Sequence, residues 1–583
     1  MIIFILMITV FLLIKNISDF TPEDMFSLSE KIESFSLLDQ EGKYHELSYY
    51  SDQKVIVIAS YAIDCPESDQ AVRMLEKIKR KYAKKDGQFL LIDANPADTR
   101  EALQQKAKIS NIDIPILMDE TQLISDSLGF THVGQVVVIN PKNWELMYRA
   151  AIDNRYLPKA IKATLSGRKI KTPLIDVQNC IIPYVKDSAK ISYEQDIVPI
   201  LEKHCIACHN KNGSAPWTMT NYEKIKGWAP MISEVVKTKR MPPWGPDLYY
   251  DQYTNSNHLT IIETQKLIHW LEQGCPKEPH EEDTLPKIEE EEAKKKQGWP
   301  WGEPDIIVAA QSEEQIPPKK IYEYAKESAG KINNTKDLWA RAIFFKPQSV
   351  KATRIASAWI DIQDPEQVLT NSSIQHFRTK TLLAYHSFNT FAYPQIFPKN
   401  TGEFIPKDST VTFQTHYKTI GKAEKDRPQV GIYLYHGDPH TIKPIYTRVI
   451  EFNDISIPVN VKNYEITTSQ ILDQDIYLYA CGFHMHYFGR SGKMIATYPD
   501  GDQKVLLSIP YYDYDWMTPY YFVTPKLLPK GTKLTLKYTY DTSVQNRKRP
   551  PVGEKVLYGT SGKTEMLGGA IIYTLADETI KLQ

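Results

Sequence analysis

The chain has 583 residues, more than one domain usually holds, and we expect roughly three to five domains. Its formal net charge of −1 argues against nucleic acid as a main partner. The six cysteines are too few for a scaffold built from disulfides; the sequence leaves room for one structural disulfide but does not identify its pair.

An apolar run opens the chain, from Ile2 to Ile14, and ends at Lys15. It is shorter than the ~20 residues that a membrane span needs, and it suits the apolar core of a secretion signal. No basic residue precedes the run and no small-residue cleavage site follows it. Residues 1–20 are therefore either a signal peptide or an N-terminal membrane anchor. In both cases we expect the rest of the chain in the periplasm or outside the cell.

Strand and helix patterns alternate between residues 21 and 175. An unbroken apolar run predicts a buried strand, and apolar positions at helical spacing follow it. The predicted elements are strand Lys54–Ala59, helix Ser68–Lys84, strand Phe89–Asp93, helix 97–109 and strand Gln135–Ile139. This alternation indicates an α/β domain, and the order of elements resembles a thioredoxin-like or peroxiredoxin-like fold.

Cys65 precedes Pro66 at the first predicted strand-to-helix turn, where such folds place a reactive cysteine. A helix N-terminus lowers the pKa of a thiol and raises its thiolate fraction. However, Ser68 takes the place of a second cysteine, and the loop Thr131–Gly134 lacks the proline that such folds usually carry. These departures favour a structural domain, and a redox-active Cys65 stays open as the alternative.

Residues 185–285 carry the motif Cys205-Ile206-Ala207-Cys208-His209. Two thiols at this spacing form thioethers to haem vinyl groups, and the adjacent His209 ligates the iron. The alternative is half of a zinc site, which needs a second ligand pair. His258 and Cys275 do not offer a matching spacing, so the motif predicts c-type haem (heme c).

Two helices, Ile191–Leu201 and Ile261–Gln273, flank the haem motif. Met241, followed by two prolines that stiffen the chain, is the expected second axial ligand. The other candidates for this position are Met219 and Met231. The segment resembles a small all-α cytochrome c-like domain, and a His–Met pair implies an electron-transfer haem.

A charged segment, 286–300, follows and contains Glu-to-Lys pairs that support a short exposed linker helix. From Trp301 the pattern changes to alternating strands: Thr410–Tyr417, Gln429–Tyr435 and Lys533–Tyr540. We expect two tandem antiparallel β-sandwiches, 301–455 and 456–583.

His484 and His486 stand two residues apart in a predicted strand, and Met566 lies in a later one. Alternate residues of a strand share a face, so both imidazoles can reach one metal. Two imidazoles and a thioether suit copper. The alternative interpretation is a pair of partly buried, hydrogen-bonded histidines.

Around these residues, the chain from Trp301 onward resembles the type II copper, ascorbate-dependent monooxygenases, the group of peptidylglycine α-hydroxylating and dopamine β-monooxygenases. The resemblance implies that His484, His486 and Met566 hold the oxygen-activating, catalytic copper. It also implies a second, electron-storing copper, bound by three histidines in the first sandwich.

His416 matches one ligand of that second copper, but the expected histidine pair is here Gln375-His376. An amide oxygen is a poor ligand for Cu(I). The site therefore recruits His386, holds copper loosely through His376 and His416, or stays empty.

These patterns predict an exported copper monooxygenase that hydroxylates a C–H bond of an unknown organic substrate with O2. Its electrons come from ascorbate or a redox protein, or through the fused haem. One alternative is a non-catalytic haem- and copper-binding protein for electron transfer or copper handling. Another is a peroxidase that uses Cys65. The cluster Tyr511–Trp516 either lines a substrate pocket or forms a packed strand, which we favour.

Overall fold

The computed structural model describes residues 30–576 except 83, 85, 169–179, 186–189, 244, 296, 320–322, 362–379, 388–394, 438–440 and 560. The predicted signal or anchor, residues 1–20, lies outside this part. No helix among the described residues is both long and apolar enough to cross a membrane. The chain forms two compact units, residues 1–188 and 189–583.

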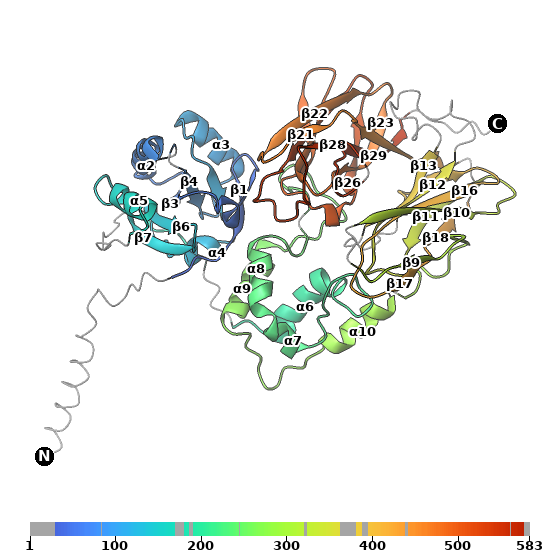
Figure 1. Ribbon diagram of the computed structural model, residues 1–583, viewed down its shortest axis with the longest axis horizontal. Helices are drawn as coiled ribbons and strands as arrows, with labels where there is room; N and C mark the ends of the chain where they lie inside the picture. The colour runs from blue at the N-terminus through green and yellow to red at the C-terminus, as the bar shows by residue number, and fades with distance from the viewer. Residues whose placement is uncertain are drawn as a thin grey trace, which may run out of the picture. The chain divides into compact units, whose positions relative to one another are not determined.

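The first unit is built on one mixed sheet of seven strands, in the order β2-β1-β5-β4-β3-β6-β7 (Figure 1). The three strands β3, β4 and β5 are parallel, and the flanking strands pair antiparallel. The strands are β1 Ser36–Asp39, β2 Tyr44–Glu46, β3 Val55–Tyr61, β4 Gly87–Asp93, β5 Ile116–Met118, β6 Gln135–Asn140 and β7 Glu145–Ala151.

Helices cover both faces of this sheet, which explains the unbroken apolar run of β3. Val55 and Val57 pack with apolar residues of α2, α3 and α5, whereas Ile56 and Ile58 pack with α4 on the other face. The helical segments are η1 Leu47–Tyr50, α2 Ser68–Tyr82, α3 Arg100–Ile109, α4 Leu123–Ser127 and α5 Leu157–Leu165. The predicted α/β domain is confirmed, and the sequence missed the shorter strands, such as the three-residue β5.

The second unit begins with helices. They are η3 Tyr193–Ile197, α6 Val198–Leu201, η4 Glu202–Ile206, α7 Tyr222–Gly227, α8 Ala229–Lys237, α9 Ile261–Glu272 and α10 Leu285–Lys295. Thr260 and Glu263 form a capping box at the start of α9. Trp270 of α9 is fully buried and stacks on Tyr193, with ring centroids 5.8 Å apart.

Helix α10 departs from the expected exposed linker because one of its faces is buried. Glu289 accepts a hydrogen bond from the backbone N–H of Lys211, and the carbonyl of Ala293 accepts one from Asn212. Ala293 is completely buried. The helix therefore packs on the haem-motif segment, because every fourth residue of a helix returns to the same face.

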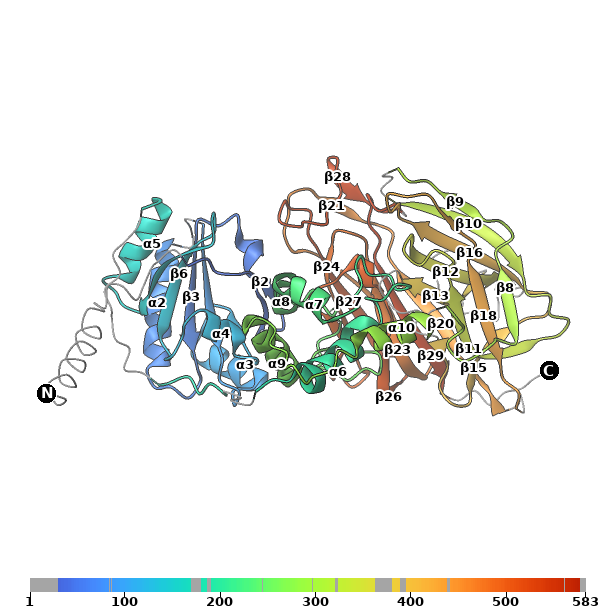
Figure 2. The same ribbon diagram turned by 90° about the horizontal axis from the view of Figure 1, so that it is seen from below.

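Two β-sandwiches follow, coloured from yellow-green to red along the chain (Figure 2). The first has the sheets β10-β16-β12-β13 and β19-β15-β11-β18-β8, with β14 beside β11 and a separate β9–β17 pair. Its strands are β8 Ile306–Ala309, β9 Glu314–Ile316, β10 Tyr324–Lys331, β11 Leu338–Lys346, β12 Thr353–Asp361, β13 Lys380–Ser387, β14 Gln395–Ile396, β15 Thr401–Ile405, β16 Thr410–Tyr417, β17 Glu424–Asp426, β18 Gln429–Leu434 and β19 Lys443–Pro444.

The second sandwich has the sheets β20-β29-β23-β26 and β22-β27-β24-β25, and a β21–β28 pair. Its elements are β20 Tyr446–Glu451, β21 Ser456–Pro458, β22 Tyr464–Ile471, β23 Ile476–His484, β24 Gly489–Thr497, β25 Gln503–Ile509, η8 Tyr514–Trp516, β26 Tyr520–Leu528, β27 Lys533–Tyr540, β28 Lys555–Leu557 and β29 Gly568–Leu575. Strand β20 precedes the predicted boundary near residue 455 and yet pairs with β29. Alternate residues of β27 are buried, as a one-sided strand requires.

The segment 247–255, between α8 and α9, binds along the edge of the second sandwich. Backbone hydrogen bonds join Thr254 to Tyr521, Val523 to Gln252, and Asp247 to Ser508. Asn255 donates a side-chain hydrogen bond to the carbonyl of Pro519 and accepts one from the N–H of Tyr521. The helical part and the second sandwich therefore share a hydrogen-bonded edge.

Tyr253 is the apolar centre of this edge. It is 6% exposed, it packs on Tyr520 and Phe522, and its hydroxyl donates to the carbonyl of Leu506 at 2.5 Å.

We expect Tyr253→Ala to lower the free energy of unfolding of the second unit by about 3–5 kcal/mol, because it removes a buried ring. Tyr249→Ala, at a ring that is 39% exposed, is the matched control. Urea unfolding followed by tryptophan fluorescence measures both; equal losses would contradict the prediction.

Candidate metal centre

The two histidines of the His-x-His motif lie at the end of strand β23. His484 is the last residue of the strand, opposite Gly568 of β29, and His486 lies in the turn that follows. Their ring centroids are 5.3 Å apart and the rings are nearly perpendicular. The sequence predicted both on one strand; the chain leaves the strand before His486, yet the two rings stay neighbours.

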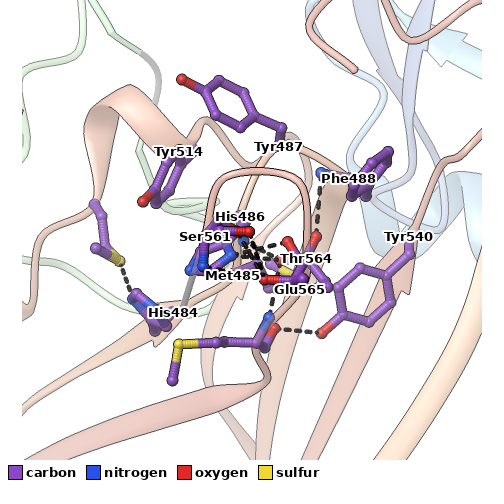
Figure 3. A network of polar contacts seen from close by, with 12 residues as sticks. His484, Met485, His486, Tyr487, Phe488, Tyr514, Tyr540, Ser561, Thr564 and Glu565 are labelled. Carbon is purple, nitrogen blue, oxygen red and sulfur yellow. Dashed lines mark hydrogen bonds and ion pairs between the residues drawn. The ribbon is translucent and has the colours of Figure 1, made fainter. Parts of the chain in front are cut away.

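His486 is buried and its ring is oriented by a backbone carbonyl (Figure 3). Its Nδ1–H donates to the carbonyl oxygen of Thr564 at 2.9 Å, which leaves the lone pair on Nε2. Burial lowers the pKa of His486 to about 4, and the nearby carbonyls and Glu323 oppose this only in part. At neutral pH the ring is therefore uncharged, as a metal ligand must be.

His484 faces a methionine that the sequence did not single out. Its Nδ1 lies 2.7 Å from the Sδ atom of Met517. Burial, then the neighbouring His486 and His416, holds the pKa of His484 well below its usual range. Met517 directly follows the aromatic-acidic cluster, but nothing local in the sequence connects it with a histidine 33 residues earlier.

Met566 is linked to His486 through Glu565, because the backbone N–H groups of His486 and Met566 donate to the same carboxylate oxygen of Glu565. The register between β23 and β29 ends at His484 and Gly568. Strand β29 begins only at Gly568, so the strand predicted from Lys563 starts later than expected.

Among the His, Cys, Asp and Glu side chains that the structure describes, the only group of three with ligand atoms in mutual reach is Cys65, Glu67 and Cys180. No described histidine or carboxylate therefore completes such a group with both His484 and His486, whereas the thioether sulfur of Met517 lies beside the His484 ring. Thioethers favour Cu(I), and imidazoles accept either oxidation state of copper. The donor set fits copper.

Glu565 is a completely buried carboxylate that holds the turn after β23. Its oxygens accept the backbone N–H groups of His486, Phe488 and Met566, the last two at 3.1 Å. Burial raises the pKa of Glu565 to about 8, and these N–H groups oppose the rise. No sequence motif indicates this role of Glu565, because the turn that it binds lies 79 residues earlier.

His416, on β16 of the first sandwich, lies near the pair and is oriented by Glu323. Its Nδ1 donates to Glu323 at 2.9 Å, and the same oxygen accepts the hydroxyl of Tyr514 at 3.1 Å. Burial alone would raise the pKa of Glu323, but the His416 hydrogen bond and the Arg354 charge lower it. The ring of Tyr514 in turn packs on His486, with centroids 5.1 Å apart.

Arg354 joins the two sandwiches beneath this cluster. It is almost fully buried, and its guanidinium contacts the rings of Tyr487 and Tyr514, at 4.7 and 4.8 Å from their centroids. It also pairs with Asp515. Residues 514–516 form the short helix η8, capped by Asp513, and not the packed strand that we expected. Tyr514 is nevertheless buried.

The other predicted copper ligand of the first sandwich, His376, lies outside the described residues, as does Gln375. The backbone of His386 is described, in β13 opposite Ala356.

In the haem motif, His209 is held as a ligand would be. Its Nδ1–H donates to the carbonyl of Trp217 at 3.0 Å, and Nε2 keeps its lone pair. Burial lowers its pKa, so the ring is neutral. Trp217 packs edge-on against His209 and stacks on Trp228, with centroids 4.9 and 4.8 Å apart.

Cys205, in η4, and Cys208, directly before His209, are half-buried cysteines that take part in no disulfide. Burial, and then the proximity of Cys208, raises the pKa of Cys205 to about 12. Met241 is 39% exposed, and its N–H donates to the carbonyl of Val235. Met219 is buried, and its N–H donates to the carbonyl of His209.

In the first unit, Cys65 forms a disulfide with Cys180. The sequence allowed one disulfide but did not identify the pair, because the two residues are 115 positions apart.

The family comparison matches the first unit. Residues 28–150 match the model of the AhpC/TSA family and form a thioredoxin-like domain of that kind. No curated protein matches the chain.

Three solved structures show the extent of the likeness. A hypothetical protein from Sinorhizobium meliloti is 21% identical, with 27% of this chain and 96% of that chain covered and a TM-score of 0.26. Peroxidoxin BcpB from Mycobacterium tuberculosis is 18% identical, with 24% and 97% covered and a TM-score of 0.21. A thiol-disulfide oxidoreductase from Bacteroides fragilis is 19% identical, with 23% and 98% covered and a TM-score of 0.21.

Replacing each methionine separately identifies the thioether ligand. We expect Met566→Ala to weaken Cu(I) binding by at least about tenfold, because the pair then loses a soft ligand. Met517→Ala tests the thioether that the structure places on His484. Competition with a Cu(I) chelator measures both variants, with Met231→Ala, at a side chain that is 46% exposed, as the control. Unchanged affinity in both would exclude a thioether ligand.

Glu565→Gln tests whether the buried carboxylate positions His486. The amide keeps the size of the side chain but turns one acceptor into an N–H that faces backbone N–H groups. We expect copper affinity to fall by about 10–100-fold, as for other residues that orient metal ligands. Glu554→Gln, at an exposed carboxylate, is the control. Isothermal titration with copper gives the comparison, and equal affinities would show that Glu565 has no part in the site.

Proposed function

We propose that the chain is an exported copper-dependent monooxygenase that hydroxylates a C–H bond of an organic substrate with O2. The observation that carries this proposal is the pair of neutral imidazoles, His484 and His486, with the Met517 sulfur beside the His484 ring. The backbone N–H groups of His486 and Met566 also share one oxygen of Glu565. The oxidoreductases that resemble the first unit do not bear on this proposal, because His484 and His486 lie in the second unit.

Copper, when bound, would supply the one-electron chemistry that O2 activation requires. The protein's part is to hold the ligands. The Thr564 carbonyl fixes the tautomer of His486, and Glu565 fixes its backbone. The ring of Tyr514 packs against the His486 ring and limits its movement. The low pKa values of both histidines keep protons from competing with the metal at neutral pH.

We further propose that a c-type haem on Cys205, Cys208 and His209, with Met241 as the expected second axial ligand, passes electrons toward this centre. Two contacts favour such a route. His204, directly before Cys205, contacts Asn257 through its Nδ1 at 2.8 Å. Asn255 binds the carbonyl of Pro519, two residues after Met517. The haem segment and the copper site thus belong to one hydrogen-bonded framework.

A second candidate is a haem- and copper-binding protein without catalysis. Gln375, in place of an expected histidine, favours it, because the electron-storing copper then has at most His376 and His416 from the expected set. Copper stoichiometry separates the two: two tightly bound coppers per haem support the monooxygenase, and one supports the electron carrier.

Oxygen reactivity tests the main proposal. Haem- and copper-loaded protein is reduced without oxygen and mixed with O2 in a stopped-flow instrument while the haem spectrum is recorded. We expect haem re-oxidation to be at least about tenfold faster with copper than without it, and His484→Ala to abolish this difference. His436→Ala, at an exposed histidine, is the control. Re-oxidation that does not depend on copper would refute the proposed electron route.

A further inference from the structure

A cavity of about 470 Å³ lies in the second unit, where the haem-motif segment and helix α10 meet the first sandwich. Asn212, three residues after His209, and Gln297, two residues after α10, line one part of it. Residues 346–351 at the end of β11, and Arg427 between β17 and β18, line the rest. Small-molecule sites in proteins usually measure about 300–1,000 Å³, so the cavity has the size of a ligand site.

The charges in the cavity lining are unbalanced. Lys346, Lys351 and Arg427 line it together with a single carboxylate, that of Glu424. That carboxylate is already paired with Lys422, at 2.6 Å. Among the described residues, no ion pair joins any of the three lining cations to a carboxylate. Clustered charge of one sign attracts ligands of the opposite sign, so the cavity favours an anion.

The loop that carries Lys351 is held by a buried carboxylate. Asp426 is completely buried, and its Oδ1 atom accepts the N–H groups of Gln348 and Ser349, at 2.7 and 2.8 Å. The carbonyl of Ser349 in turn accepts the N–H of Ala352. This wall of the cavity is therefore fixed before a ligand arrives, which lowers the entropic cost of binding.

The other two cations are anchored as well. Lys346 donates from Nζ to the carbonyl of Gln297 at 2.8 Å and lies 4.7 Å from the centroid of the Trp299 ring. Arg427 donates from Nε to the carbonyl of Ala310 at 2.8 Å. Each of these bonds uses one N–H, and an ammonium or guanidinium group has further N–H donors. Both side chains therefore keep donors for a ligand.

We propose that this cavity is a binding site for a small organic anion with at least two oxyanion groups, a polycarboxylate or a phosphate ester. Lys346, Lys351 and Arg427 bind the oxyanion groups, and the planar guanidinium of Arg427 suits a carboxylate or a phosphate. Pro347 and Val350, the apolar residues of the lining, contact the carbon skeleton. The ligand thereby joins the helical part of the second unit to the first sandwich. This site is separate from the proposed copper and haem ligands.

Isothermal titration of the full-length protein tests the site with three probes: citrate, adenosine 5′-monophosphate and inorganic phosphate. We expect citrate or the nucleotide to bind one-to-one and at least about tenfold more tightly than inorganic phosphate, because only the organic anions extend across the cavity to separate cations. The tighter of the two shows whether the ligand is a polycarboxylate or a phosphate ester. Equal affinities for all three probes would reveal an adventitious ion only and overturn the proposal, as would no binding of either organic probe.

Variants of the lining locate the binding. We expect Lys351→Gln and Arg427→Gln each to weaken binding of the tighter probe by at least about tenfold, because each loses a charged hydrogen-bond donor. Val350→Glu, which adds a carboxylate to the lining, should abolish binding. Lys336→Gln, at an exposed lysine of the same sandwich outside the cavity, is the control. Unchanged affinity in the three lining variants, or an equal loss in the control, would overturn the assignment.

Discussion

The candidate copper site depends on one buried interaction, the carboxylate of Glu565 with the backbone N–H groups of the turn after β23. Without these bonds the turn would bury unpaired donors, at a cost of about 1–3 kcal/mol each. With them, His486 stays beside His484 although it has left the strand. The same carboxylate binds the N–H of Met566. A single acidic side chain therefore brings both ends of the site together.

Contacts between the two sandwiches also support the histidine pair. Arg354 is buried against the rings of Tyr487 and Tyr514, and its charge is matched by Glu323 and Asp515. A buried cation is tolerated only when it is paired in this way. Because Glu323 also orients His416, the first sandwich is coupled to the histidine pair of the second through charge and hydrogen bonding.

The two halves of the chain present sulfur chemistry of different kinds. In the second unit, thioethers lie beside neutral imidazoles, which suits a soft metal. In the first unit, two cysteine sulfurs are joined in a disulfide, with the carboxylate of Glu67 beside Cys65. Cys205 and Cys208 form a third case, two cysteines outside any disulfide that precede a histidine whose Nδ1 is held by a backbone carbonyl.

Local sequence determined the elements and the types of ligand. The apolar run of β3, the alternation of β16 and β27, and the spacing of Cys205–His209 and His484–His486 all express short periods along one segment. Tertiary structure alone decided the partners: Met517 for His484, Glu323 for His416 and Cys180 for Cys65. These contacts join residues 33, 93 and 115 positions apart. A local sequence pattern cannot predict these contacts, because they form only when the folded sheets bring distant segments together.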